Sequence, residues 1–106
     1  TAFRFETGFA TLEDTAGRSA AQITGGSLAV NFSAREFATT LGLMHPATGS
    51  VTLSRSGRLT DDGMFAARDA QGVVAGAVSM DGSQVGYLFQ QLTPQGTLSG
   101  LTQWRR

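Results

Sequence analysis

The chain contains one histidine, His45, and its place beside Met44 suggests an axial pair for haem iron. Imidazole nitrogen and thioether sulfur are the axial haem ligands of the cytochromes c. The competing interpretation is a histidine in an exposed turn, because His45 precedes Pro46 and the residue before a proline avoids the α region. We expect the turn, and haem ligation is the less favoured hypothesis.

Tyr87 and Trp104 are the single tyrosine and the single tryptophan of the chain. With His45 they form the candidate ligand-binding set, because a small β-barrel can hold one ligand among such side chains. The alternative is that both aromatic side chains simply fill the interior of the fold. We expect a filled interior.

The remaining side chains do not form a catalytic or metal-binding motif. The absence of cysteine excludes thiolate metal sites and thiol catalysis. The aspartates at 61, 62, 69 and 81 fall in expected turns and lack the spacing of a calcium loop. No Gly-x-Ser-x-Gly motif is present. We therefore predict a protein that is not an enzyme and has neither a metal site nor a resident cofactor.

Composition narrows the classes of partner. Lys and Arg together equal Asp and Glu in number, so the formal net charge is zero and no basic surface for nucleic acid is expected. No apolar run reaches the roughly 18 residues that a membrane-spanning helix needs. A chain of 106 residues is one domain, 1–106. Because it begins Thr1-Ala2, we expect it to be excised from or part of a larger protein.

Alternating apolar residues and fourteen glycines predict short strands joined by tight turns. The first segment, 2–12, places Phe3, Phe5 and Phe9 on one parity, as in a strand with one buried face. Further strands are expected over 27–33, 51–59, 64–68, 73–80, 84–91 and 97–104. We predict an all-β fold, an antiparallel up-and-down β-barrel of about eight strands, with a β-sandwich as the alternative.

Segment 34–44 is ambiguous. Ser33 and Glu36 could form a helix capping box, whereas Phe37, Thr39 and Leu41 alternate as in a strand. We favour the strand, with a one-turn helix as the alternative. Gly76 and Gly86 lie inside the expected strands on either side of the Asp81-Gly82 turn. We predict that they make room for a bulky neighbour such as Tyr87 or Trp104.

Four segments, SLAVNFSAREFATTLGL, GRLTDDGMFAA, VAGAVSMDGSQVGYLF and GTLSGLTQW, resemble the small β-barrel domain of transferrin-binding protein B and its relatives. The resemblance covers 27–104, and C-terminal barrel tails of FecR-type envelope proteins look similar. The matching positions, which are structural in that family, are Asn31, Phe32, Gly63, Phe65, Gly76, Gly86 and Phe89. The segment 79–82 departs from the family pattern, which has Phe/Tyr-Gly-Pro there.

The resemblance implies a lipoprotein-like or secreted module of a Gram-negative bacterium, set in the cell envelope at the outer membrane. We therefore expect a chain at the cell surface, in the periplasm or secreted, which binds a protein or serves as a scaffold and is linked to iron or solute acquisition. The alternative function is a carrier that holds haem or a lipophilic ligand inside the barrel.

Overall fold

The structure, a computed structural model, describes all 106 residues and consists of eight β-strands joined by turns. The strands are β1 (Ala2–Asp14), β2 (Gly17–Asn31), β3 (Glu36–His45), β4 (Gly49–Arg58), β5 (Met64–Asp69), β6 (Gly72–Val78), β7 (Gln84–Thr93) and β8 (Gly96–Arg105). No helix long and apolar enough to cross a membrane occurs in this fold.

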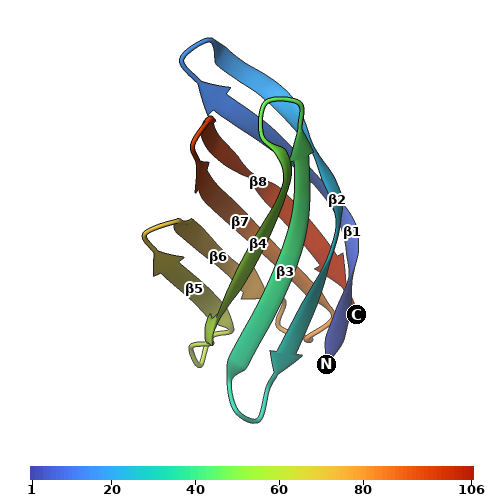
Figure 1. Ribbon diagram of the computed structural model, residues 1–106. Helices are drawn as coiled ribbons and strands as arrows, with labels where there is room; N and C mark the ends of the chain where they lie inside the picture. Colours follow the sequence, from blue (N-terminus) through green and yellow to red (C-terminus); the bar gives the residue numbers. More distant parts are fainter.

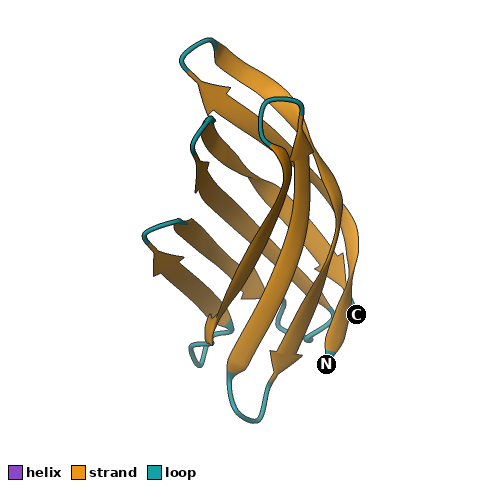
Figure 2. Ribbon diagram, in the orientation of Figure 1, coloured by secondary structure: helices purple, strands orange, loops and turns teal.

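The strands form one antiparallel sheet in the order β4-β3-β2-β1-β8-β7-β6-β5. Pairing of β1 with β8 joins the two ends of the chain. β4 and β5 form no ladder with each other, and the backbone pairing at this point is an isolated bridge between Leu59, which follows β4, and Phe65. The sheet curls until β3 and β4 lie across from β6, β7 and β8 (Figure 1, Figure 2). The predicted up-and-down barrel is confirmed. It is nearly closed, with a seam between β4 and β5.

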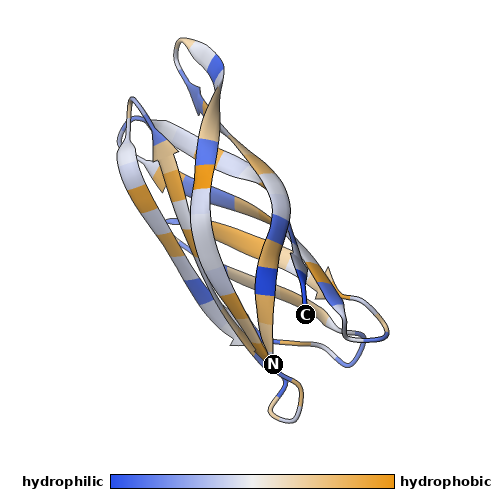
Figure 3. Cartoon of the chain, turned by 90° about the vertical axis from the view of Figure 1, so that its right-hand side faces the viewer, coloured by the Kyte–Doolittle hydropathy of each residue, from blue (hydrophilic) through white to orange (hydrophobic).

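Alternate residues of each strand point into the barrel, and polar and apolar residues accordingly succeed each other along the ribbons (Figure 3). Eighteen buried apolar residues form a single core, and Trp104 and Phe89 are the largest of the fully buried side chains. Phe65 also lies in this core, so Phe65 and Phe89 have the interior positions expected of them. An eight-stranded barrel is just wide enough for side chains to fill, and these side chains fill it.

The two hairpin glycines have different environments. Gly76 pairs with Tyr87, and a Cβ atom added at Gly76 would lie 2.5 Å from Tyr87 Cβ. Gly86 faces outward opposite Ala77, and a Cβ atom added there would meet nothing closer than the Thr102 carbonyl oxygen at 3.8 Å. The prediction that a glycine makes room for a bulky neighbour is confirmed for Gly76 and wrong for Gly86.

The ambiguous segment is a strand, because β3 runs from Glu36 to His45. Residues 32–35, which precede β3, form a tight turn and not a helical one. The Asn31 Oδ1 atom accepts the Ala34 N–H at 3.0 Å, and Arg35 adopts a left-handed φ of 56°. The resemblance gave Phe32 as a structural position. It lies instead in this turn with 43% of its surface exposed, because β2 ends at Asn31.

A second correction concerns Phe9. The pairing of β1 with β8 shifts register between Phe5 and Thr7, where Glu6 is an extra residue. A bulge of one residue moves every later side chain to the opposite face. Phe3 and Phe5 therefore point inward as predicted, whereas Phe9 points outward and is 58% exposed.

Candidate functional site

The interior of the barrel is occupied by a contiguous aromatic layer. Tyr87 and Trp104 are stacked with ring centroids 5.8 Å apart, and Phe5 meets Trp104 edge to face at 5.4 Å. Phe65 contacts both Phe37, at 4.4 Å between centroids, and Tyr87, at 6.4 Å. Tyr87 and Trp104, two of the three predicted ligand-binding residues, thus pack against each other and against protein.

The polar atoms of this layer are bonded within the barrel. Trp104 Nε1 donates to Thr102 Oγ1 at 2.8 Å, and Thr102 Oγ1 donates to the Tyr87 carbonyl oxygen at 3.3 Å. Thr39 Oγ1 donates its only proton to the Ser27 carbonyl at 2.9 Å, so the Tyr87 hydroxyl, 2.9 Å away, must donate to Thr39. Burial raises the pKa of the Tyr87 phenol above 10.0. No polar group of this layer is left over for a ligand.

His45, the third predicted ligand residue, is buried and is the last residue of β3, so its expected position in an exposed turn is wrong. Its side chain follows the inward parity of Leu41 and Leu43, which places it under the β1–β2 hairpin. His45 lies six residues along β3 from Thr39, the partner of Tyr87, or about 20 Å. The structure therefore separates His45 from the Tyr87–Trp104 pair.

The hydrogen bonds of His45 fix its tautomer. Nδ1 accepts the Ala47 N–H at 3.0 Å, so in the neutral ring the proton lies on Nε2, which donates to Ser19 Oγ at 2.7 Å. Ser19 and His45 thus have the spacing of a nucleophile and its base, but the tautomer is the opposite of the one that accepts a serine proton. Iron ligation would break one of these bonds. Met44, the other half of the suggested haem pair, faces away from His45 because neighbours on a strand point to opposite faces.

The aspartates of the turns bond to backbone and hydroxyl groups nearby. Asp81 Oδ1 accepts the Ser79 hydroxyl at 2.8 Å, the Ser83 hydroxyl at 2.7 Å and the Ser83 N–H at 3.0 Å. The Ser83 and Ser79 bonds lower the pKa of Asp81 to about 2. Asp69 Oδ1 accepts the Gln71 N–H at 2.8 Å, so the turn roles predicted for Asp69 and Asp81 are confirmed.

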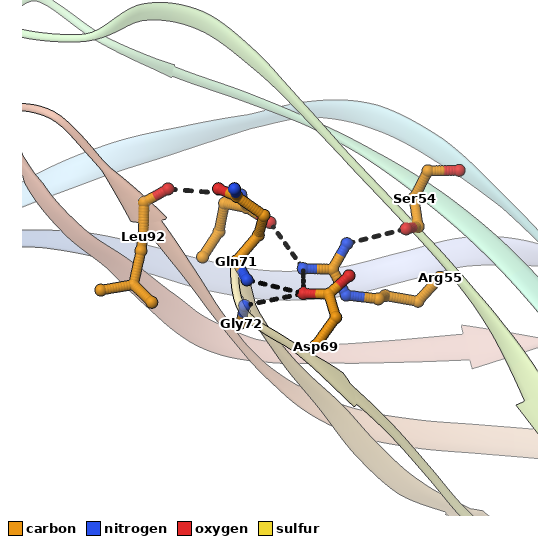
Figure 4. Close-up of polar contacts among 7 residues, drawn as sticks. Ser54, Arg55, Asp69, Gln71, Gly72 and Leu92 are labelled. Atoms are coloured by element: carbon orange, nitrogen blue, oxygen red, sulfur yellow. Dashed lines mark hydrogen bonds and ion pairs between the residues drawn. The ribbon is translucent and has the colours of Figure 1, made fainter.

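The seam between β4 and β5 contains a buried cation that the sequence analysis missed (Figure 4). Arg55 points inward from β4 with only 10% of its side chain exposed. Its Nη2 lies 3.1 Å from Asp69 Oδ1 and donates to Gln91 Oε1 at 3.1 Å, while Nη1 donates to the Ser54 carbonyl oxygen at 2.8 Å. The Arg55 Nε is buried without a partner.

This ion pair closes the seam. A short edge strand and an inward-pointing charge are two devices by which sheets prevent the addition of further strands. β5 has six residues, and Arg55 lies on the opposite edge strand. We therefore interpret Arg55 and Asp69 as a structural strap between edges and not as a ligand site.

The outer surface carries the most distinctive feature of the molecule, a row of apolar residues across five neighbouring strands. Cross-strand pairing sets five outward residues side by side: Phe9 (β1), Leu101 (β8), Leu88 (β7), Ala75 (β6) and Ala66 (β5). We call these five residues the outer apolar row. Leu88 and Leu101 are each 48% exposed. The sequence offers one signal for the row, which is that Leu88 and Leu101 stand at positions of outward parity.

The adjacent row makes this surface a groove. It runs through Thr7, Gln103, Gly86, Ala77 and Met64, again paired strand by strand. Small residues at its centre lie below the larger side chains of the outer apolar row. The resulting hollow has a volume of about 1120 Å³ and is open to solvent. The two rows, including the polar Thr7 and Gln103, cover roughly 20 Å by 14 Å, on the order of 300 Å². This is the lower end of the range for the largest apolar patch of a monomer, a patch that is often functional.

The opposite outer face is different in character. There the paired residues Ser27, Thr40 and Ser54 form a polar row across β2, β3 and β4. The polar row shows that outward positions of this barrel can be polar. The outward apolar residues of β1, β8 and β7 are therefore not required by the fold. The outer apolar row is therefore the candidate functional site.

The comparisons with known proteins identify no relative of this chain: no family model matches it, and no curated protein or solved structure is significantly similar.

Proposed function

We propose that this barrel is a non-catalytic binding module that docks another protein through the outer apolar row. The observation that carries the proposal is the unbroken alignment of Phe9, Leu101 and Leu88 on neighbouring strands, each about half exposed. Large contiguous apolar surfaces on small soluble domains mark interaction sites, whereas scattered exposed apolar residues do not. The outer wall of the barrel presents such a row to a partner without any rearrangement of the backbone.

The setting that we propose is the envelope of a Gram-negative bacterium, at the cell surface, in the periplasm or in secreted form, with a link to iron or solute acquisition. Its support is the resemblance of residues 27–104 to the transferrin-binding protein B barrel, together with the barrel fold itself. The rival function, a carrier of haem or a lipophilic ligand, needs interior space that Tyr87 and Trp104 occupy.

The test uses a matched pair of variants. Leu88→Thr combined with Leu101→Thr removes the centre of the outer apolar row while keeping two residues suited to strands. Leu92→Thr is the control, because Leu92 lies on the same strand with the same exposure, 49%, but outside the row. Each protein is immobilised and incubated with an extract of the source organism, and retained proteins are compared.

We expect one or more proteins to be retained by the wild type and by Leu92→Thr but lost from the double variant. Equal retention by the double variant would place binding elsewhere on the barrel. Retention of nothing by the wild type beyond what a blank matrix retains would contradict docking to a different protein of that extract.

A further inference from the structure

We infer that a second copy of this chain covers the outer apolar row, in a two-fold dimer that packs sheet against sheet. The inference rests on the proposed docking function and names the partner of that same surface. Its basis is the order of side-chain sizes along the row. The large residues Phe9 and Leu101 lie on β1 and β8, while the small residues Ala75 and Ala66 lie on β6 and β5.

A two-fold axis parallel to the strands and passing over β7 relates these two ends. It places β8 of one copy over β6 of the other, and β1 over β5, because the strand order is β1-β8-β7-β6-β5. Leu101 then faces Ala75 of the second copy, and Phe9 faces its Ala66. Each copy therefore contributes large side chains where the other has space, which is the self-complementarity that an isologous interface requires.

Leu88 lies on β7 and meets its own counterpart at the axis, with Gly86 beside it in the adjacent row. Gly86 has no side chain, and a Cβ atom added there would touch nothing of this chain within 3.8 Å. The hollow at this outward glycine leaves room beside the axis for the two Leu88 side chains that meet there.

Charge does not oppose the association. The formal net charge of the chain is zero, no member of the outer apolar row or of the adjacent row is ionisable, and Arg58 is the single charged residue that lines the hollow. Two copies therefore meet without the repulsion that like-charged surfaces would impose.

The area of contact is small for a specific interface. The outer apolar row and the adjacent row together supply roughly 300 Å² per copy, including the polar Thr7 and Gln103, well below the about 800 Å² per partner of a standard interface. The polar residues flanking the rows, among them Thr11, Ser99 and Gln90, supply the remainder as a rim. The dimer is accordingly a reversible one at the weak end of specific interfaces.

Sedimentation equilibrium of the full chain tests the inference. The weight-average mass should rise from 11.1 kDa toward twice that value between about 10 µM and about 500 µM, as expected for a dimer with a dissociation constant on the order of 100 µM. Leu101→Thr should abolish the rise, and Leu92→Thr should leave it unchanged.

The decisive variant is Ala75→Leu. It makes the surface more apolar, so non-specific adhesion would increase, but in the two-fold dimer the new side chain collides with Leu101 of the second copy. We expect Ala75→Leu to remain at 11.1 kDa throughout the concentration range. Stronger association of Ala75→Leu would overturn the two-fold geometry.

A wild type that stays monomeric at every concentration would overturn the dimer. The docking function would still stand if the extract experiment showed a different protein lost from the Leu88→Thr, Leu101→Thr variant. Failure of both experiments would reject the outer apolar row as a binding surface.

Discussion

Alanine at Gly76 should destabilise the barrel strongly, whereas alanine at Gly86 should not. The added methyl group at Gly76 would lie 2.5 Å from Tyr87 Cβ and 2.7 Å from Tyr87 Cα. Both atoms belong to or adjoin the backbone of the paired strand, so no side-chain rotation removes the collision. Relief requires the β6–β7 pair to separate locally, in the part of the sheet that carries the Tyr87–Trp104 stack.

The magnitude follows from the immobility of the colliding atoms. Overpacking of a core costs typically about 1–3 kcal/mol, and a clash with backbone belongs at the upper end, about 3 kcal/mol. At Gly86 the nearest atom is 3.8 Å away, so no strain arises. Restriction of the unfolded chain should then stabilise Gly86→Ala by up to about 1 kcal/mol.

Urea unfolding measures both free energies, with the fluorescence of the single, buried Trp104 as the signal. Equal m-values for the variants would show that the surface exposed on unfolding is unchanged, so that the urea midpoints compare stabilities directly. A Gly76→Ala variant within about 0.5 kcal/mol of the wild type would refute the steric argument, since that is the range of ordinary surface substitutions. Equal losses at Gly76 and Gly86 would refute it as well.

Other predictions concern the buried polar groups. Thr39→Val should cost more stability than Tyr87→Phe, about 2 against about 1 kcal/mol by urea unfolding, because valine leaves the Tyr87 hydroxyl without an acceptor whereas phenylalanine leaves Thr39 bonded to Ser27. Because burial raises the pKa of Tyr87 above 10.0, the folded chain keeps a proton that the unfolded chain releases; stability should fall as the pH rises above about 10, and Tyr87→Phe should abolish that fall in the urea midpoint. Asp69→Asn should cost about 1–2 kcal/mol in thermal or urea unfolding, because it leaves the buried Arg55 without its counter-charge. The exposed Asp61 partner of Arg35 should tolerate the same change with a loss below about 0.5 kcal/mol, and equal losses at the two aspartates would contradict the buried strap.

Much of the fold could be predicted from period-two alternation. In β7 and β8, inward residues such as Val85, Phe89 and Leu98 alternate with outward ones, and the turn at Asp81-Gly82 uses the positive φ of Gly82, 74°. The beginning of β2 was missed because Gly17 to Gly26 contains few large apolar residues, although its backbone pairs with β1 and β3. A pattern of side chains predicts a strand only where the strand covers the core.

The candidate site was largely beyond prediction because it depends on register. Nothing in the sequence around Glu6 marks a bulge, so Phe9 was assigned to the buried face together with Phe3 and Phe5.

The buried ion pair at the seam was missed although Arg55 offered a visible signal, since it shares the inward parity of Val51 and Leu53. Its buried position depends on Asp69 and Gln91 across the seam, and such a contact between distant segments is not encoded locally.

The bulge also explains why Phe9 is outside, and this supports a role for it beyond folding. Gly8 lies opposite Thr102, and a Cβ atom there would lie 2.6 Å from the Leu101 carbonyl oxygen. The barrel therefore requires a glycine at position 8, and the next residue, Phe9, points toward solvent. A polar residue suited to strands would satisfy the fold equally well there.

Phe9→Thr should therefore change the free energy of unfolding by no more than about 0.5 kcal/mol in urea, the range of surface substitutions, while weakening whatever binds the outer apolar row. A destabilisation of about 2 kcal/mol or more would mean that Phe9 is retained for the fold, as a core truncation of this size implies. Unchanged stability combined with lost association would mean that the chain carries a large exposed aromatic residue for its partner, and it would assign the function of this barrel to its outer wall.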